Sequence, residues 1–202
     1  MDNSKKQFEL LKLGEKTSNK LFNSSKEKLI CHPEALPAFE AWSAVKKHDL
    51  KHDAVPDQMK ELYVRTANKV AVVTEEKSST THKQARQTLY FLNGFDTIQQ
   101  IIHLDIVKLP MTVVSSPNAE AILQHSWFEV AKLMFLPLER RLGWVSYRDV
   151  INQHMPPLLI NQFFGKDRIT VEMLLQLSGM DKRAYERMRA CYREIHPVVS
   201  RE

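Results

Sequence analysis

The residues of this chain whose types suit chemistry are mostly basic or hydroxylated, and one set lies on the β-branched run IVKLPMTVVSSP. This run carries Lys108, Thr112 and Ser115 together with Pro110 and Pro117. Lysine and hydroxyl side chains bind phosphates and base edges, and prolines can wedge against base steps in the minor groove. The set therefore favours contact with double-stranded DNA through a β-ribbon. One strand of a small sheet, or a dimer contact without a ligand, explains the same run, because proline is tolerated on edge strands.

A second basic set lies near the C-terminus, in a segment that resembles a helix-turn-helix. The segment 170–195 predicts two helices, and Gly179 supplies the left-handed residue of the turn between them. Lys182, Arg183 and Arg187 would then face outward, with the right chemistry for phosphates and guanine edges.

The apolar residues of this segment are predicted to face the core: Leu174 and Leu177 from the first helix, and Tyr185 and Met188 from the second. Leu175 stands where such motifs usually keep a small residue that lets the helices approach. A plain αα-hairpin with a solvated basic face is common in helical proteins and explains the pattern as well. We therefore expect a structural hairpin here, with DNA contact as the alternative.

Catalytic and metal-binding patterns are weak by comparison. The chain holds no GxSxG, Walker A or GxGxxG motif, and Cys31 directly precedes His32, so that their side chains point apart. His48 and His52 have the spacing of two metal ligands on a helix, but no HExxH pattern surrounds them. We expect no enzyme, no cofactor, no metal and no small-molecule substrate, and keep a metal-dependent enzyme on the two histidines as an alternative.

Composition and charge agree with a soluble protein that has an anionic partner. The charged fraction of 26% and the hydrophobic fraction of 43% are ordinary for a globular chain, and the net charge of +5 permits nucleic-acid binding without requiring it. Two distant cysteines predict reduced thiols, and no apolar run reaches the roughly 18 residues of a membrane span. The N-terminus is polar and lacks a signal-peptide pattern. We therefore expect a cytoplasmic protein without membrane contact.

Helices dominate the elements expected to position these residues. Only five glycines occur in 202 residues, which disfavours a turn-dense all-β fold. Residues 75–81 have no large apolar side chain and predict an exposed loop. The helices predicted from apolar spacing, prolines and capping residues cover 8–30, 37–45, 56–70, 85–92, 95–104, 117–136, 147–153, 158–164, 170–177 and 181–195.

The predicted fold class is therefore mainly α. We expect residues 1–202 to form a single helical domain with a short, proline-containing β-ribbon near 105–116. A lone strand is marginal in water, so the ribbon must pair with something. Pairing with its own copy is the economical solution and predicts a homodimer.

Residues around the ribbon are similar to one known family. Val107-Lys-Leu-Pro110, then Ser116-Pro117, and then Ala121, Leu123 and Phe128 resemble the AcaB-type activators of plasmid and integrative-element conjugation genes. The resemblance covers about residues 104–145. It implies a proline-rich β-hairpin on a helical body, a dimer, and DNA contact upstream of transfer genes, with Lys108, Pro110 and Pro117 as the residues that carry over.

The leading prediction is a dimeric, sequence-specific DNA-binding regulator that contacts DNA through the ribbon, and the resemblance implies that it activates plasmid transfer genes. The alternative from another class is an adaptor or chaperone subunit of a bacterial secretion or conjugation machine. Such a protein would hold partner helices on its apolar, methionine-rich surfaces.

Overall fold

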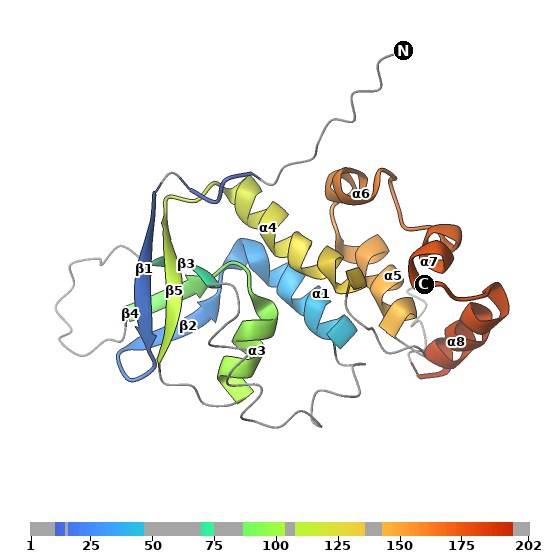
Figure 1. Ribbon diagram of the computed structural model, residues 1–202, viewed down its shortest axis with the longest axis horizontal. Coiled ribbons are helices and arrows are strands. Elements are labelled where there is room, and N and C mark those ends of the chain that lie inside the picture. The colour runs from blue at the N-terminus through green and yellow to red at the C-terminus, as the bar shows by residue number, and fades with distance from the viewer. Residues whose placement is uncertain are drawn as a thin grey trace, which may run out of the picture. The chain divides into compact units, whose positions relative to one another are not determined.

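The fold is a mixed α/β fold built around a five-stranded sheet (Figure 1). The computed structural model describes residues 11–14, 16–46, 70–74, 87–103, 108–135 and 143–195. Contacts divide the chain into two compact units. Unit 1 comprises residues 1–39 and 53–129, and unit 2 comprises residues 40–52 and 130–202.

The sheet belongs to unit 1 and has the strand order β1-β5-β3-β4-β2. Antiparallel pairs join β1 to β5 and β3 to β4, whereas parallel pairs join β3 to β5 and β2 to β4. The strands are β1 (Lys16–Asn23), β2 (Glu27–Cys31), β3 (Val70–Thr74), β4 (Gln87–Phe91) and β5 (Lys108–Ser115).

The strands β1 and β2 stand at the two ends of this order, yet one short turn joins them. The sheet must therefore curl until its ends approach each other at that turn. Polar contacts close the gap: Lys20 Nζ donates to Gln87 Oε1 at 2.9 Å and forms an ion pair with Glu27. The other Glu27 oxygen accepts the Asn23 N–H at 2.8 Å. Glu27 is buried, and these partners compensate for removing its charge from water.

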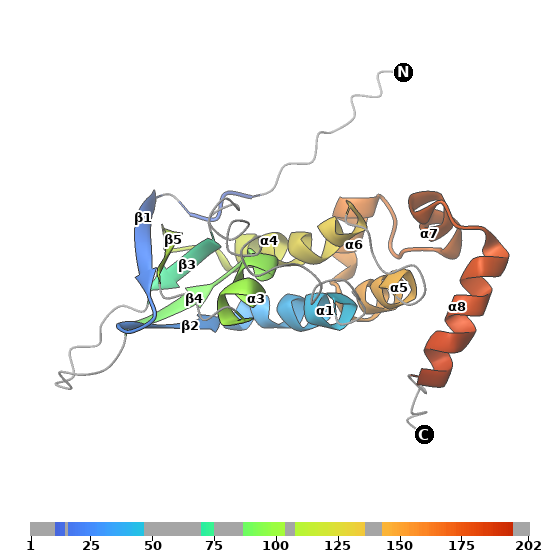
Figure 2. The same cartoon turned by 60° about the horizontal axis from the view of Figure 1, so that its bottom comes forward.

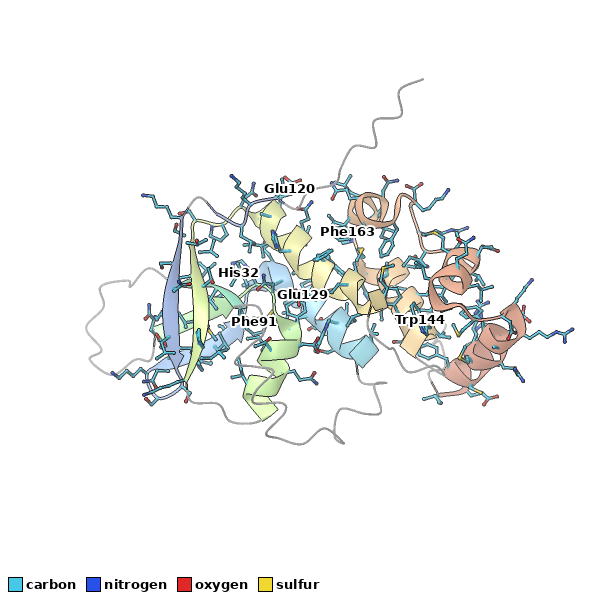
Figure 3. The ribbon with its side chains drawn as sticks, in the orientation of Figure 1. His32, Phe91, Glu120, Glu129, Trp144 and Phe163 are labelled. Carbon is cyan, nitrogen blue, oxygen red and sulfur yellow. The ribbon has the colours of Figure 1, made fainter. Side chains whose placement is uncertain are left out.

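Helices cover the sheet and complete the core of unit 1. They are the 3-10 turn η1 (Pro33–Ala35), the first part of α1 (Leu36–Lys46), α3 (Phe95–His103) and most of α4 (Ala119–Ala131). Phe39, Phe91 and Phe95 pack edge to face, with ring centroids between 5.1 and 6.3 Å apart. The buried Glu129 of α4 accepts the N–H of Phe95 at 3.3 Å and so satisfies the start of α3 (Figure 3).

Unit 2 is helical wherever the structure describes it. Beyond the ends of α1 and α4 it contains η3 (Lys132–Phe135), α5 (Gly143–His154), α6 (Pro157–Phe164), α7 (Val171–Ser178) and α8 (Lys182–Ile195). Its core includes Trp42, Leu133, Tyr147, Ile151 and Ile160, each less than 2% exposed.

The predicted mainly helical fold is wrong, because two segments predicted as helices are strands. Residues 16–31 form β1 and β2, and residues 87–91 form β4. In β4 the side chains of Leu89 and Phe91 are buried while Tyr90 is only half-buried, which is the two-residue period of a strand. Leucines three and four residues apart in the sequence suggested a helix, but pairing with distant strands decided the outcome.

The predicted β-ribbon is also corrected. Strand β5 does form, but it pairs with β1 on one side and β3 on the other, so it is an inner strand of the sheet. Its backbone therefore needs no second copy as a partner, and the argument for a dimer from an unpaired ribbon no longer holds. The homodimer itself stays a prediction.

Several helices are confirmed: α1, α3, α6, α7 and α8 have ends shifted by only one residue, whereas α4 ends five residues earlier than predicted and α5 begins four residues earlier. In α4 the N-terminal cap is Asn118, whose Oδ1 accepts the Glu120 N–H at 2.9 Å. The predicted loop 75–81 and the histidines His48 and His52 lie outside the described residues, as does all of the predicted helix 56–70 except Val70, which begins β3. No helix in the described ranges is long and apolar enough to cross a bilayer.

Candidate nucleic-acid interface

Helix α5 is the platform on which the C-terminal helices are built. Its first turns bury Trp144, Val145 and Tyr147, and its later turns bury Val150 and Ile151 (Figure 3). The Tyr147 hydroxyl donates to the Ala131 carbonyl at 2.8 Å. Burial raises the pKa of Tyr147, so this hydroxyl keeps its proton and its hydrogen bond. The buried side of α5 is thus anchored in the core of unit 2.

Asn152, on the last turns of α5, fixes the chain that leads into α7. Its side-chain amide makes two hydrogen bonds to the backbone of Ile169, with Nδ2 donating to the carbonyl at 2.9 Å and Oδ1 accepting the N–H at 2.8 Å. Ile169 is fully buried. One residue later Thr170 caps α7, and its hydroxyl accepts the Met173 N–H at 3.2 Å. The start of α7 is therefore held both by α5 and by its own cap.

The turn between α7 and α8 is short, and several hydrogen bonds fix its conformation. Gly179 has a φ of 66° in the left-handed region, and its N–H donates to the Leu175 carbonyl. Met180 N–H then reaches the Ser178 hydroxyl, and Asp181 Oδ1 accepts the Ala184 N–H at 2.8 Å to cap α8. The predicted left-handed glycine is confirmed, and these hydrogen bonds set the direction in which α8 leaves the turn.

The directions of α7 and α8 bear on whether they form a crossed pair or an antiparallel hairpin. Both α7 and α8 pack against α5. In Figure 2 the two helices run in clearly different directions. A hairpin would instead place them side by side along their length. This arrangement favours the helix-turn-helix interpretation, and the αα-hairpin with a solvated basic face stays a prediction beside it.

The two faces of α8 differ sharply in character. Tyr185 is 1% exposed and Met188 is half-buried, as predicted, whereas Lys182, Arg183 and Arg187 are exposed. The helix carries five basic and two acidic residues. On α7, Leu174 is buried as predicted, but Leu177 is 39% exposed and does not face the core. The outer face of α8 is thus a basic surface on a helix whose inner face is anchored.

Besides Glu186 and Glu194 of α8 itself, which are exposed, Glu172 of α7 is an acidic residue near Lys182. The pKa of Glu172, in the first turn of α7, lies below its usual value. The first cause is a hydrogen bond from the Glu172 backbone, followed by the Thr170 side chain and by the charges of Lys182 and Arg148. Arg183 and Arg187 have no ion pair with any residue that the structure describes.

The other predicted DNA-binding residues lie on or next to β5, in unit 1. Lys108 and Pro110 are exposed, opposite Asn23 and Leu21 of β1. Thr112 is half-buried between two strands, and the Ser115 hydroxyl donates to the Lys16 carbonyl at 3.1 Å. Half-buried Pro117 precedes α4. These five residues belong to unit 1, whereas Lys182, Arg183 and Arg187 belong to unit 2.

Sequence reasoning missed Asn152, which positions the helix pair. No local pattern marks an asparagine that binds the backbone of a residue 17 positions later. Metal sites need at least three suitable side chains, and no such group occurs in the described part of the chain.

Comparison with known proteins adds no relative. No protein-family model, curated protein or solved structure matches the chain. The resemblance to AcaB-type activators therefore stays a prediction, and the functional argument depends on the geometry of the helix pair and its charges.

Proposed function

We propose that this protein is a transcriptional regulator that binds double-stranded DNA, and that α7 and α8 form its helix-turn-helix with α8 as the reading helix. The observation that carries the proposal is the crossed packing of α7 and α8 on α5, which leaves the basic face of α8 in solvent. In proteins of this architecture the second helix lies in the major groove, and its first residues contact base edges. Arg183 and Arg187 occupy the first turns of α8.

Arginine suits this role because its planar group can donate two hydrogen bonds to a guanine edge. Arg183 and Arg187 are one helical turn apart and both exposed, so they share one face of α8. Tyr185 holds the opposite face in the core. Contact through the inner strand β5 is less well supported, because a strand with neighbours on both sides cannot enter a groove as a separate ribbon.

The proposal is tested by selecting duplexes from a random library and measuring binding to the best sequence by fluorescence anisotropy. We expect Arg183→Gln and Arg187→Gln each to cost about 1–3 kcal/mol of binding free energy and to relax the base preference at one position. Lys12→Gln together with Lys16→Gln is the control, since both lysines are exposed in unit 1, away from the proposed reader in sequence. It should leave the base preference unchanged.

Two results would count against the proposal. A wild-type protein that selects no sequence, and whose binding to any duplex is undetectable in 50 mM salt, is not a DNA-binding regulator of this kind. Selection that survives both arginine substitutions unchanged would exclude α8 as the reading helix. A selected site with two inverted half-sites about 10 base pairs apart would support the predicted homodimer.

A further inference from the structure

The turn that joins β1 and β2 exposes a second basic surface, in unit 1. Residues 16–31 contain four lysines and a single acid, Glu27. Glu27 is 8% exposed and binds Lys20 and the Asn23 N–H, so its charge is already compensated inside the sheet. The exposed charges of these strands are therefore all positive.

Three exposed lysines lie at this end of the sheet. Lys108, the first residue of β5, lies opposite Asn23 in the strand register, and the Asn23 carbonyl accepts the Lys26 N–H at 3.0 Å. Lys26 and Lys108 thus flank the same residue. Lys28 lies two positions after Lys26 and on the same side, because the intervening Glu27 points inward. We name Lys26, Lys28 and Lys108 the turn surface. Figure 1 shows the β1–β2 turn and the start of β5 at the same end of the sheet.

The turn that presents these lysines is itself ordered by hydrogen bonds. Asn23 Oδ1 accepts both the N–H and the hydroxyl of Ser25, at 3.1 and 2.7 Å. The Gln87 N–H donates to the Lys26 carbonyl at 3.1 Å and ties the turn to β4. The backbone beneath the lysines is therefore fixed, whereas their ammonium groups extend into solvent. A fixed group of like charges with no exposed acid among its described neighbours on β1, β2 and β5 suits a partner with regularly spaced negative charges.

We propose that the turn surface contacts the phosphate backbone of double-stranded DNA. This inference rests on the proposed function, and it gives unit 1 a role that carries no base preference of its own. Lysine neutralises phosphates and releases condensed counterions, so such contacts add affinity that depends steeply on salt. It also gives Lys108 a function different from the predicted one: it contacts DNA from the end of a sheet instead of within a groove-entering ribbon.

The test compares Lys26→Gln/Lys108→Gln with the charge-matched Lys12→Gln/Lys16→Gln protein, using the full chain and the selected duplex. Each lost phosphate contact lowers the slope of log affinity against log salt by about 0.9, which is about an eightfold loss in 0.1 M salt. The turn variant should therefore lose roughly 60-fold in affinity and about 1.8 in slope. The control variant should lose much less, and both should keep the wild-type base preference.

Hydroxyl-radical footprinting separates direct contact from a general loss of positive charge. The wild-type protein should protect a stretch of backbone that the turn variant leaves exposed and the control variant still protects. The inference is overturned if the two variants have equal affinities, equal slopes and equal footprints. If the wild-type protein binds no duplex, the proposed function fails with it. If only the α8 substitutions have no effect, the turn surface stands and the reading helix is wrong.

Discussion

The amide of Asn152 offers the sharpest test of how the helix pair is held. It connects α5 to the residue before the cap of α7 through two hydrogen bonds of 2.8 and 2.9 Å to Ile169. Replacing Asn152 with alanine removes both partners at once and leaves the backbone N–H and carbonyl of the fully buried Ile169 without them. The substitution changes no charge and alters no residue of α7 or α8.

The expected cost follows from these two orphaned groups. A buried backbone group that loses its only partner costs about 1–3 kcal/mol, so two give about 2–6 kcal/mol. Asn152 itself is half-buried, so water can enter the space of the lost amide and satisfy part of this demand. We therefore expect about 2–3 kcal/mol, at the lower end of the range.

Amide hydrogen exchange followed by mass spectrometry measures this cost where it arises. A loss of 2–3 kcal/mol corresponds to roughly 30- to 150-fold faster exchange in peptides from α7 and α8 that exchange by opening from α5. The matched control is Asn161→Ala, which removes an exposed hydrogen bond to Asp167 in the same unit. It should change exchange in these helices by no more than a few-fold.

The reasoning is refuted if Asn152→Ala leaves exchange in α7 and α8 at the wild-type rate. It is also refuted if Asn161→Ala has an equal effect, since the hydrogen bonds to Ile169 would then have no special role. Asn152→Ala should also bind DNA more weakly without any change in base preference, because Asn152 positions α8 and does not contact the duplex.

Three further predictions concern the same helices. Gly179→Ala should destabilise by about 1–2 kcal/mol in thermal unfolding because of its positive φ alone, since an added Cβ meets no atom within 4 Å; a larger loss would reveal an unseen clash. Tyr185→Phe should leave the free energy of unfolding unchanged or raise it, because the buried hydroxyl has no hydrogen-bond partner among the described residues; a clear loss in urea unfolding would contradict this. The pKa of Glu172, followed by NMR, should lie below the usual value and rise in Thr170→Val, and an equal pKa in both proteins would exclude the Thr170 hydrogen bond. Because the folded pKa is the lower one, the contribution of this carboxylate to stability is present above the unfolded pKa and is lost as the pH falls through the folded value.

Local signals predicted the C-terminal half well. Gly179 has the predicted left-handed conformation, and the helices predicted over 158–164, 170–177 and 181–195 are found with ends shifted by no more than one residue. The burial of Leu174 and Tyr185 also follows from spacing along a single helix. The exposure of Leu177 does not, because burial also requires a neighbouring element to cover that position of the helix.

The N-terminal half shows where local reasoning fails. Lys16 and Ser115 are 99 positions apart in the chain and neighbours in the sheet, and no pattern around either residue names the other. The β-branched residues of β5 correctly predicted a strand. Local patterns do not reveal its partners β1 and β3, because the apolar spacing of residues 8–30 and 56–70 predicts helices over β1 and up to the start of β3.

The net charge follows from composition, and the basic face of α8 and the turn that precedes it follow from local patterns, because capping, glycine conformation and helical periodicity are effects of neighbouring residues. The tertiary structure alone decided that β5 is an inner strand, that Lys26 and Lys108 flank one residue, and that α7 and α8 cross on α5. These outcomes depend on hydrogen bonds and packing between segments far apart in the chain. The energies of such contacts come from burial and from partner groups that no local pattern encodes.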